Sequence, residues 1–445
     1  MNQDAIRDAR QLGVPKMLLL GLQHMFAMFG ATVLVPAITG LSISATLLFA
    51  GLGTLLFHLI TGRKVPAFLG SSFAFLGAYG LVTASGAEIP LTYSSFGVAC
   101  AGLLYLILAL LFKVFGAQKV MRYFPPIVTG PVIIAIGLTL SQSAVDNCSS
   151  NWLVALAAIL VVIIFNIWGK GMLKIIPILL GVLVSYIFSL IIDPASRDTL
   201  VQHVSEAAWI GLPVHWNNTA FSIFGDGFDG GMLITATITI MPIALATMVE
   251  HIGDICAISS TVGKNFVADP GLHRTLTGDG LATTIAALFG APANTTYGEN
   301  TGVLALSKVY DPRVIRLAAI FSVVLSFCPK FSAIIAAMPA ATIGGVSLVL
   351  YGMISAVGVR NVVENQVDFT KSRNVIIAAL ILVLSIGIKY SSMGAISFPV
   401  GSITISLSGL AVAAIVGIAL NAILPGKDYE FQKDNEGSTS VNFKV

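Results

Sequence analysis

The chain has 445 residues, of which 56% are hydrophobic and only 10% are charged, and its mean hydropathy is +0.91. Soluble domains carry about 25% charged residues, so this composition excludes an ordinary soluble enzyme or binding domain. The net charge of +3 is too small to indicate nucleic acid as a partner. Apolar runs long enough to cross a bilayer recur from about Lys16 to Pro425, which predicts an all-α polytopic membrane protein.

The start of the chain has no features of a cleaved signal peptide. Residues 1–16 are polar and charged, and the apolar run that follows is too long for a signal sequence. The four cysteines have neither a CxxC motif nor a metal-binding spacing, so we expect them to be structural and expect no metal site.

The first half of the chain predicts seven membrane spans, each an apolar run between charged or turn-rich breaks. They lie near residues 17–38, 43–61, 68–84, 93–115, 126–143, 152–168 and 174–192. The polar stretch at about 193–229 is predicted to be a long loop.

The second half predicts seven more spans, two of them short and irregular. They lie near residues 232–256, 275–289, 293–308, 313–334, 340–357, 374–388 and 404–424. The polar tail after Pro425 is predicted to be mobile.

The distribution of basic residues predicts the orientation. With fourteen spans both termini lie on one side of the membrane. If that side is cytoplasmic, 21 of the 24 Lys and Arg residues lie in cytoplasmic segments, and only Arg197, Lys330 and Lys389 do not. This bias is the positive-inside pattern, so we expect both termini to be cytoplasmic.

Several residues recur between the two halves, at offsets of 227 or 226 in the earlier spans and 214 in the later ones. The matched positions are Gln23-His24 with Glu250-His251, Gly51 with Gly278, Gly53 with Gly280, Pro66 with Pro292, Pro125 with Pro339, and Gly130 with Gly344. Because each half has an odd number of spans, the second copy inserts upside down. Two inverted seven-span repeats are typical of secondary transporters, whose substrate site lies near the midplane.

Two predicted spans are interrupted at corresponding places. They begin with PAFLGSSFAF (66–75) and GAPANTTYGEN (290–300), whose Pro, Gly and hydroxyl residues oppose continuous helix. We interpret each as an extended piece that leads into a half-helix, and the alternative is an ordinary surface loop. A half-helix N-terminus would offer backbone N–H groups to a ligand.

Few ionisable residues lie away from the predicted membrane edges: His24, Glu250, His251, Asp254 and Glu299. An intramembrane charge is costly and therefore indicates function. Glu250 and Asp254 are four residues apart and share a helix face, where mutual repulsion favours proton uptake by one carboxylate. His24 and His251 are either functional or ordinary core histidines. We expect three further carboxylates to be solvated loop residues: Asp269, Asp279 and Asp311.

These groups indicate the chemistry of a ligand. The carboxylates accept hydrogen bonds, the broken helices donate them, and the rings of Phe73 and Tyr297 offer flat apolar faces. The absence of a basic residue in this set argues against phosphorylated or carboxylate substrates. A small, flat, neutral ring that carries N–H and C=O groups would fit.

Five stretches closely resemble the bacterial uracil permeases of the nucleobase–ascorbate transporter (nucleobase:cation symporter-2) family. They are QHMFAMFGATVLVP (23–36), PAFLGSSFAF (66–75), EHIGD (250–254), DPGLHR (269–274) and NTTYGENTGV (294–303). The resemblance extends over about residues 14–424. It implies proton-coupled uptake across a bacterial plasma (inner) membrane, with the proton as coupling ion and no other cofactor.

The resemblance also implies an architecture. A core domain comprises residues 1–123 (spans 1–4) and 229–336 (spans 8–11). A gate domain comprises residues 124–228 (spans 5–7) and 337–445 (spans 12–14 and the tail). Short strands begin spans 3 and 10, the core moves like an elevator, and a homodimer forms through the gate domains.

The family's substrate-binding residues correspond here to Phe73, Glu250, Tyr297, Gly298 and Glu299. Glu250 is also our candidate for proton coupling, together with His24 and Asp254. No catalytic residue is expected.

Two positions depart from the uracil-permease pattern. Asp254 replaces a histidine found in some uracil permeases and matches many purine transporters, whereas Glu299 favours a pyrimidine. In the family signature that begins at Glu299, Ser307 replaces a threonine.

We therefore predict a proton-coupled uracil importer that has the lipid bilayer and a nucleobase as partners. The alternatives are a purine (xanthine or urate) symporter of the same fold and an uncoupled nucleobase facilitator. A membrane enzyme is disfavoured because the sequence has no nucleophile–base pair, metal cluster or phosphate loop.

Overall fold

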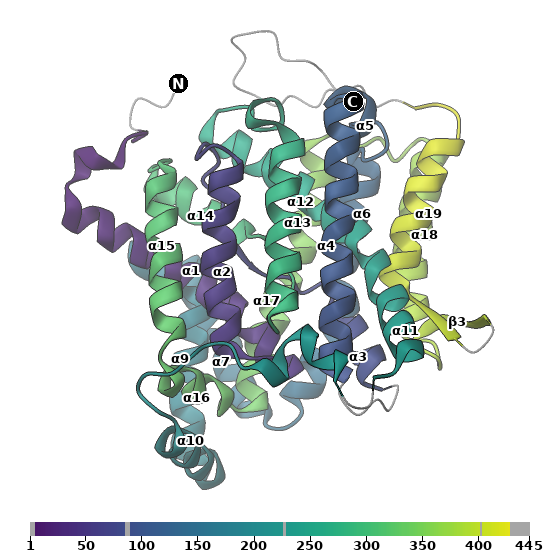
Figure 1. Ribbon diagram of the computed structural model, residues 1–445. Helices are drawn as coiled ribbons and strands as arrows, with labels where there is room; N and C mark the ends of the chain where they lie inside the picture. Colours follow the sequence, from purple (N-terminus) through teal and green to yellow (C-terminus); the bar gives the residue numbers. More distant parts are fainter. Residues whose placement is uncertain (1–4, 85–89, 226–227, 401–402, 428–445) are drawn as a thin grey trace.

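The computed structural model describes residues 5–84, 90–225, 228–400 and 403–427, and it consists mainly of α-helices that stand side by side (Figure 1). The helices of the first half are α1 (Val14–Thr39), α2 (Ile43–Ile60), α3 (Leu76–Thr83), α4 (Pro90–Phe115), α5 (Ala117–Met121), α6 (Pro126–Cys148), α7 (Trp152–Ile167), α8 (Met172–Ile175), α9 (Pro177–Ile192) and α10 (Pro194–Glu206).

The helices of the second half are α11 (Gly230–Ile240), α12 (Ala244–Val262), α13 (Leu272–Leu288), α14 (Gly298–Ser307), α15 (Pro312–Ser326), α16 (Pro329–Ala336), α17 (Ala340–Glu364), α18 (Ser372–Lys389) and α19 (Gly409–Ile423). Four strands form two antiparallel pairs: β1 (Leu69–Ser71) with β2 (Asn294–Thr296), and β3 (Ala395–Val400) with β4 (Ile403–Ser408). The predicted mobile tail lies outside the described residues from position 428 onward.

The described helices confirm a multi-span membrane protein. Seven of them are long and apolar enough to cross a bilayer, and the number rises to nine if each of two bent helix pairs is one span. The bent pairs are α9–α10, with an angle of 113°, and α15–α16, with an angle of 88°. Broken segments such as β1–α3 and β2–α14 are too short to count by length, so the total of fourteen spans stays a prediction.

The stretch at 193–229 is not simply a loop, because α10 occupies its first part. Asp193 caps this helix by accepting a hydrogen bond from the backbone N–H of Ala195, and Pro194 starts its first turn. A second difference concerns the last predicted span, whose first residues form β4. The sequence ITISLS (403–408) alternates apolar and hydroxyl residues, as a strand does.

The paired strands β1 and β2 lie where the two interrupted spans were predicted, and each leads directly into a short helix. Such backbone needs partners for its polar groups inside a membrane. Thr54 of α2 accepts a hydrogen bond from the N–H of Leu69 (2.9 Å), and Thr283 of α13 donates to the carbonyl of Asn294 (2.7 Å). Neighbouring helices therefore hold both strands in place.

The N-terminal segment packs against the loop between α14 and α15, far from it in sequence. Ile6 forms an isolated parallel bridge with Val309, and the backbone N–H of Ala9 donates to Asp311 (2.7 Å). A hydrogen bond from Arg10 holds the pKa of Asp8 well below its usual value. Residues 6–9 are thus held against the segment that follows α14.

Candidate functional site

A cavity of about 210 Å³ lies between the β1–β2 pair and helices α6, α12 and α17. Polar and aromatic side chains from the two broken segments form one wall, and α6 and α17 contribute apolar residues. The lining residues are Ser71, Phe73, Ile133, Glu250, Asp254, Thr295, Thr296, Tyr297, Gly298, Met353, Ile354 and Val357.

The two carboxylates of α12 both line this cavity, as their four-residue spacing predicts. Thr296, at the end of β2, donates a hydrogen bond from its Oγ1 to Oδ2 of Asp254 over 2.8 Å. Both Glu250 and Asp254 are partly exposed, in contrast to most of their helix neighbours. The cavity therefore presents two acceptor groups on one helix face.

The broken segments contribute the rings and the backbone donors. The hydroxyl of Tyr297 donates to the carbonyl of Ser71 (2.8 Å), which ties the start of α14 to the end of β1. The Phe73 ring packs edge-on against Tyr351, with ring centroids 5.6 Å apart. Gly298 begins α14, whose N-terminus has no side-chain cap, so its first N–H groups are suited to an acceptor on a ligand.

Two other predicted site residues, Glu299 and His24, lie in α14 and α1. Glu299 lies in the first turn of α14, but its side chain is outside the described part of the structure. His24 does not line the cavity, because it is fully buried within α1. Asn300 donates to the carbonyl of His24 (3.2 Å), and its amide nitrogen lies 3.3 Å from Nδ1 of the ring. Asn300, in the first turn of α14, thus links His24 to the segment that begins at the cavity.

The expectation for Asp279 was wrong, because it is fully buried in α13. Its Oδ2 lies 3.0 Å from Nδ1 of His251, whose side chain is also fully buried. That same nitrogen lies 3.5 Å from Oγ1 of Thr296, which holds Asp254. A continuous chain of polar groups therefore links the cavity to a buried His–Asp pair. Asp279 already fell inside a predicted span, and this was the signal that could have revealed it.

The other two carboxylates expected to be solvated differ from each other. Asp311 is 5% exposed, because it caps α15 and accepts a hydrogen bond from Ala9, so that prediction was wrong. Asp269 is solvated as predicted: its side chain is 71% exposed and pairs with Lys64.

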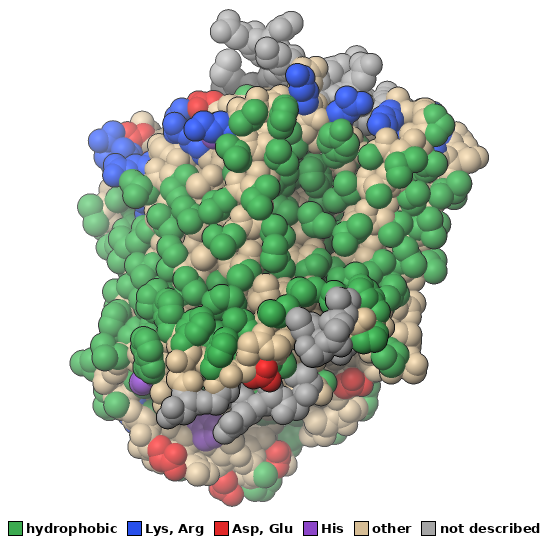
Figure 2. Space-filling model, turned by 45° about the vertical axis from the view of Figure 1, so that its right-hand side comes forward, with side chains coloured by type: hydrophobic (Ala, Val, Ile, Leu, Met, Phe, Trp, Pro, Cys, Tyr) green, Lys and Arg blue, Asp and Glu red, His purple; other side chains and the backbone are tan. Residues whose placement is uncertain are grey.

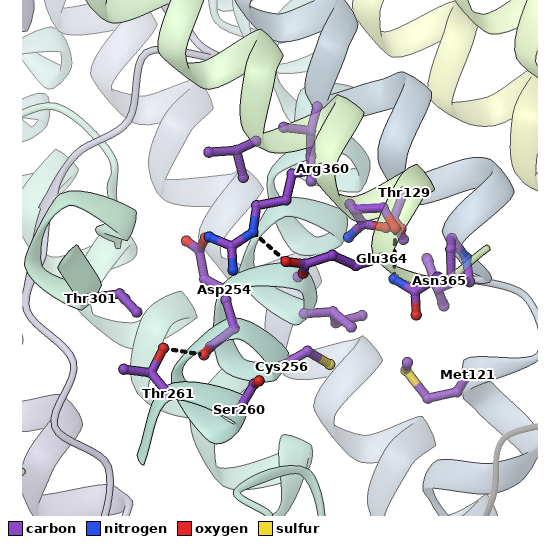
Figure 3. Close-up of a pocket in the computed structure, with 18 residues that line it drawn as sticks. Met121, Thr129, Asp254, Cys256, Ser260, Thr261, Thr301, Arg360, Glu364 and Asn365 are labelled. Atoms are coloured by element: carbon purple, nitrogen blue, oxygen red, sulfur yellow. Dashed lines mark hydrogen bonds and ion pairs between the residues drawn. The ribbon is translucent and has the colours of Figure 1, made fainter. Parts of the chain in front are cut away.

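A second cavity, of about 300 Å³, lies next to the first and shares Ile133, Asp254 and Val357 with it. We call it the vestibule. In Figure 3, Arg360 and Glu364 of α17, joined by a 2.6 Å ion pair, face the α12 side that carries Asp254, Ser260 and Thr261. The vestibule reaches Met121 of α5, at one end of the molecule in Figure 1. Lys and Arg side chains gather at the same end in Figure 2.

Comparisons with known proteins agree with this architecture. A sequence model of the permease family matches residues 15–394. The chain is 39% identical to the uracil permease of Bacillus caldolyticus, with 96% of each chain covered, and 37% identical to the uracil permease of Escherichia coli, with 91% of this chain and 90% of that one covered. The fold resembles the transmembrane domain of the cyanobacterial bicarbonate transporter BicA, with a TM-score of 0.56, 15% identity and coverage of 94% of this chain and 99% of that one.

Proposed function

Because this chain belongs to the permease family, we propose that it imports uracil across the bacterial plasma membrane together with a proton. Membership of that family makes the chain a transmembrane transporter and not an enzyme. The observation that carries the proposal is the cavity in which two carboxylates of α12 face the broken segments β1–α3 and β2–α14. Several relatives that match most of the chain are named uracil permeases.

The cavity suits a small planar base. Its volume of about 210 Å³ is below the range of roughly 300–1,000 Å³ that is typical of drug-sized ligands. In our proposal Glu250 accepts hydrogen bonds from ring N–H groups, and the N–H groups at the start of α14 donate to a ring carbonyl. Phe73 and Tyr297 supply apolar contact, and Glu299 adds a second acceptor.

Proton coupling is assigned to Glu250, with Asp254 and His24 nearby. A carboxylate that binds a proton becomes neutral. The core domain can then carry the base across the membrane without an unpaired charge in the site. The link from Asp254 through Thr296 to the His251–Asp279 pair supports this assignment, because it places further titratable groups next to the cavity. The order of events is proton first, base second, then movement.

The finer architecture belongs to the same proposal: fourteen spans, two inverted repeats, and an elevator-like core that moves against a dimeric gate. Antiparallel pairing of β1 with β2 supports the inverted repeats, since equivalent segments meet about a local twofold relation. Close packing of α6 with α17, and of α4 with α13, supports the division into gate and core. The cavity is lined by α6 and α17, which the proposal assigns to the gate, and by α12 and the broken segments, which it assigns to the core.

The orientation proposed puts both termini in the cytoplasm. The gathering of Lys and Arg at the end that carries the N-terminus supports this orientation (Figures 1 and 2). On this basis the vestibule opens inward, and the conformation described is one from which the base would leave into the cytoplasm.

The test is uptake of labelled bases into vesicles that contain the purified protein, with and without an imposed pH gradient. We expect uphill accumulation of uracil only with a gradient that is acidic outside, and competition by uracil rather than by xanthine or urate. Competition by the purines alone would identify the purine symporter. Uptake that does not change when the proton gradient is collapsed would identify an uncoupled facilitator.

A further inference from the structure

A third cavity, of about 720 Å³, lies at the Lys- and Arg-rich end and has no part in the proposed transport site. Four separate segments line it: the N-terminal segment, the turn after α2, the end of α12 with the residues after it, and the start of α15. Its basic lining residues are Arg7, Arg63, Lys64, Lys264, Arg313 and Arg316, and its acidic ones are Asp8, Asp269 and Asp311. We call it the basic cavity.

The acidic residues are already paired within the protein. Asp8 lies 2.7 Å from Nη1 of Arg313, which is also 3.0 Å from Asp311. Asp269 pairs with Lys64. The three carboxylates of the cavity therefore pair with only two of its six cations, Arg313 and Lys64.

The remaining cations have no carboxylate partner among the residues that the structure describes. Arg7 donates to the backbone carbonyl of Val262 (3.2 Å), while no ion pair is formed by Arg63, Lys264 or Arg316. Nη1 of Arg316 is buried and has no hydrogen-bond acceptor within the described part of the chain. A buried donor without a partner is costly, and a charged one more so. An anion with several oxygens would relieve both the repulsion and the missing hydrogen bond.

We propose that the basic cavity binds a phosphate group. Guanidinium groups match phosphate oxygens in a bidentate manner, and clustered cations between the cytoplasmic ends of membrane helices are typical of headgroup sites. The phosphate belongs either to an anionic lipid or to a soluble phosphate compound. The proposal is independent of which base the transporter carries.

A phosphate group bound in the basic cavity would contact segments that are distant in sequence. Tyr310 and Asp311 of the cavity wall follow directly after α14, which starts at the substrate cavity. The N-terminal segment lies on the same wall through Ile6 and Ala9. A bound phosphate would therefore link the ends of α2 and α12 and the start of α15 to the segment that follows α14.

The experiment compares the full-length protein with a Lys264→Gln/Arg316→Gln variant and a matched control. The control, Lys113→Gln/Lys119→Gln, removes two exposed cations from the same end but outside the cavity. Thermal unfolding in detergent is measured with increasing inorganic phosphate and with chloride at equal ionic strength. Native mass spectrometry measures binding of phosphatidylglycerol against phosphatidylcholine.

We expect phosphate to raise Tm beyond the effect of chloride, with an apparent affinity at least tenfold weaker in the double variant and unchanged in the control. Retention of phosphatidylglycerol without a response to free phosphate, again lost only in the double variant, would identify a lipid as the source. Equal binding by the double variant and the control would overturn the proposal, as would no binding of either probe.

Two further variants guard against a folding defect. Lys264→Gln alone changes an exposed side chain, so the fold should be retained and phosphate binding weakened. Arg316→Lys keeps the charge but loses the bidentate geometry, so we expect intermediate affinity. Full affinity in both single variants would contradict the assignment, and uracil uptake measures whether each protein is folded.

Discussion

Asp254 is the carboxylate that joins the substrate cavity, the vestibule and the buried interior. It lines both cavities and accepts a hydrogen bond from Thr296, which in turn lies 3.5 Å from His251. Glu250, one turn earlier, lines only the substrate cavity. This difference in position makes Glu250 the better candidate for direct contact with a base and Asp254 the one exposed to both spaces.

The first prediction concerns Glu250→Gln. The amide keeps the size of the side chain but cannot take up a proton, so we expect gradient-driven accumulation of uracil to fall to simple equilibration. Binding should persist, weakened by about tenfold because a charged hydrogen bond becomes a neutral one. Uptake into vesicles and isothermal titration measure the two effects.

Glu364→Gln is the matched control, since Glu364 lines only the vestibule and its side chain is 58% exposed. This variant should accumulate uracil normally. Continued uphill transport by Glu250→Gln would show that the coupling assignment is wrong.

The second prediction concerns the buried pair that sequence reasoning missed. Asp279→Asn leaves His251 beside a neutral amide in a fully buried environment. A hydrogen bond to a charged group contributes about 1.5–3 kcal/mol, so we expect a clearly lowered Tm in detergent. Asp269→Asn, at a side chain that is 71% exposed, should leave Tm nearly unchanged. Equal Tm values for the two variants would contradict a structural role for the pair.

The two broken segments depend on close packing between their backbones. A Cβ atom added at Gly70 would lie 2.6 Å from Oγ1 of Thr32 and 2.6 Å from the ring of Tyr297. Only glycine therefore lets the Tyr297 ring lie against β1. This requirement gives a reason for glycine in PAFLGSSFAF beyond its weak helix propensity.

The third prediction follows from that contact. Gly70→Ala should displace Tyr297 and weaken uracil binding by at least about tenfold, because the start of α14 moves with it. Gly80→Ala, on the neighbouring α3, is the control, since its added Cβ meets no atom within 4 Å. Binding is measured by titration with uracil. Wild-type affinity in Gly70→Ala would show that the ring position does not matter.

Sequence patterns located both broken segments because Pro, Gly and hydroxyl residues concentrate there. They missed α10 and the β3–β4 hairpin, since the stretch at 193–229 is polar and the residues of β4 continue into the apolar run of α19. The polarity of a segment indicates whether it lies in the membrane or at the surface. It does not indicate whether a surface segment is a helix or a loop. The capping residues Asp193 and Pro194 were the available signal for α10.

The vestibule adjoins the substrate cavity on the side of one end of the molecule. The vestibule continues the site toward the basic end, where the N-terminal segment also lies (Figure 1). The loop between α6 and α7, which carries Ser150, follows the far end of α6. The vestibule is lined by residues at the start of α6, so Ser150 lies beyond the opposite end of that helix.

The fourth prediction tests access to the vestibule together with the orientation. In a background without the native cysteines, Ser260→Cys in the vestibule should react with a membrane-impermeant thiol reagent applied from the cytoplasmic side. Ser150→Cys should react only from the opposite side. Both serines are exposed, so the reagent can reach each of them once it is on the correct side. Labelling of both from one side would contradict the orientation, and labelling is measured by mass shift.

The order of residues along the chain was sufficient to predict a polytopic helical protein and its broken spans. These features depend on local hydropathy, on Pro and Gly, and on helical spacing, which are all short-range properties. The family resemblance extended that reading to a substrate class.

Only the folded arrangement decided which polar groups meet. Asp279 and His251 are 28 positions apart, and the basic cavity joins four segments between Arg7 and Arg316. No periodicity within one helix specifies such contacts, because they depend on how separate helices pack against each other. The buried His251–Asp279 contact, and the cations that lack a carboxylate partner among the described residues, therefore became visible only in three dimensions.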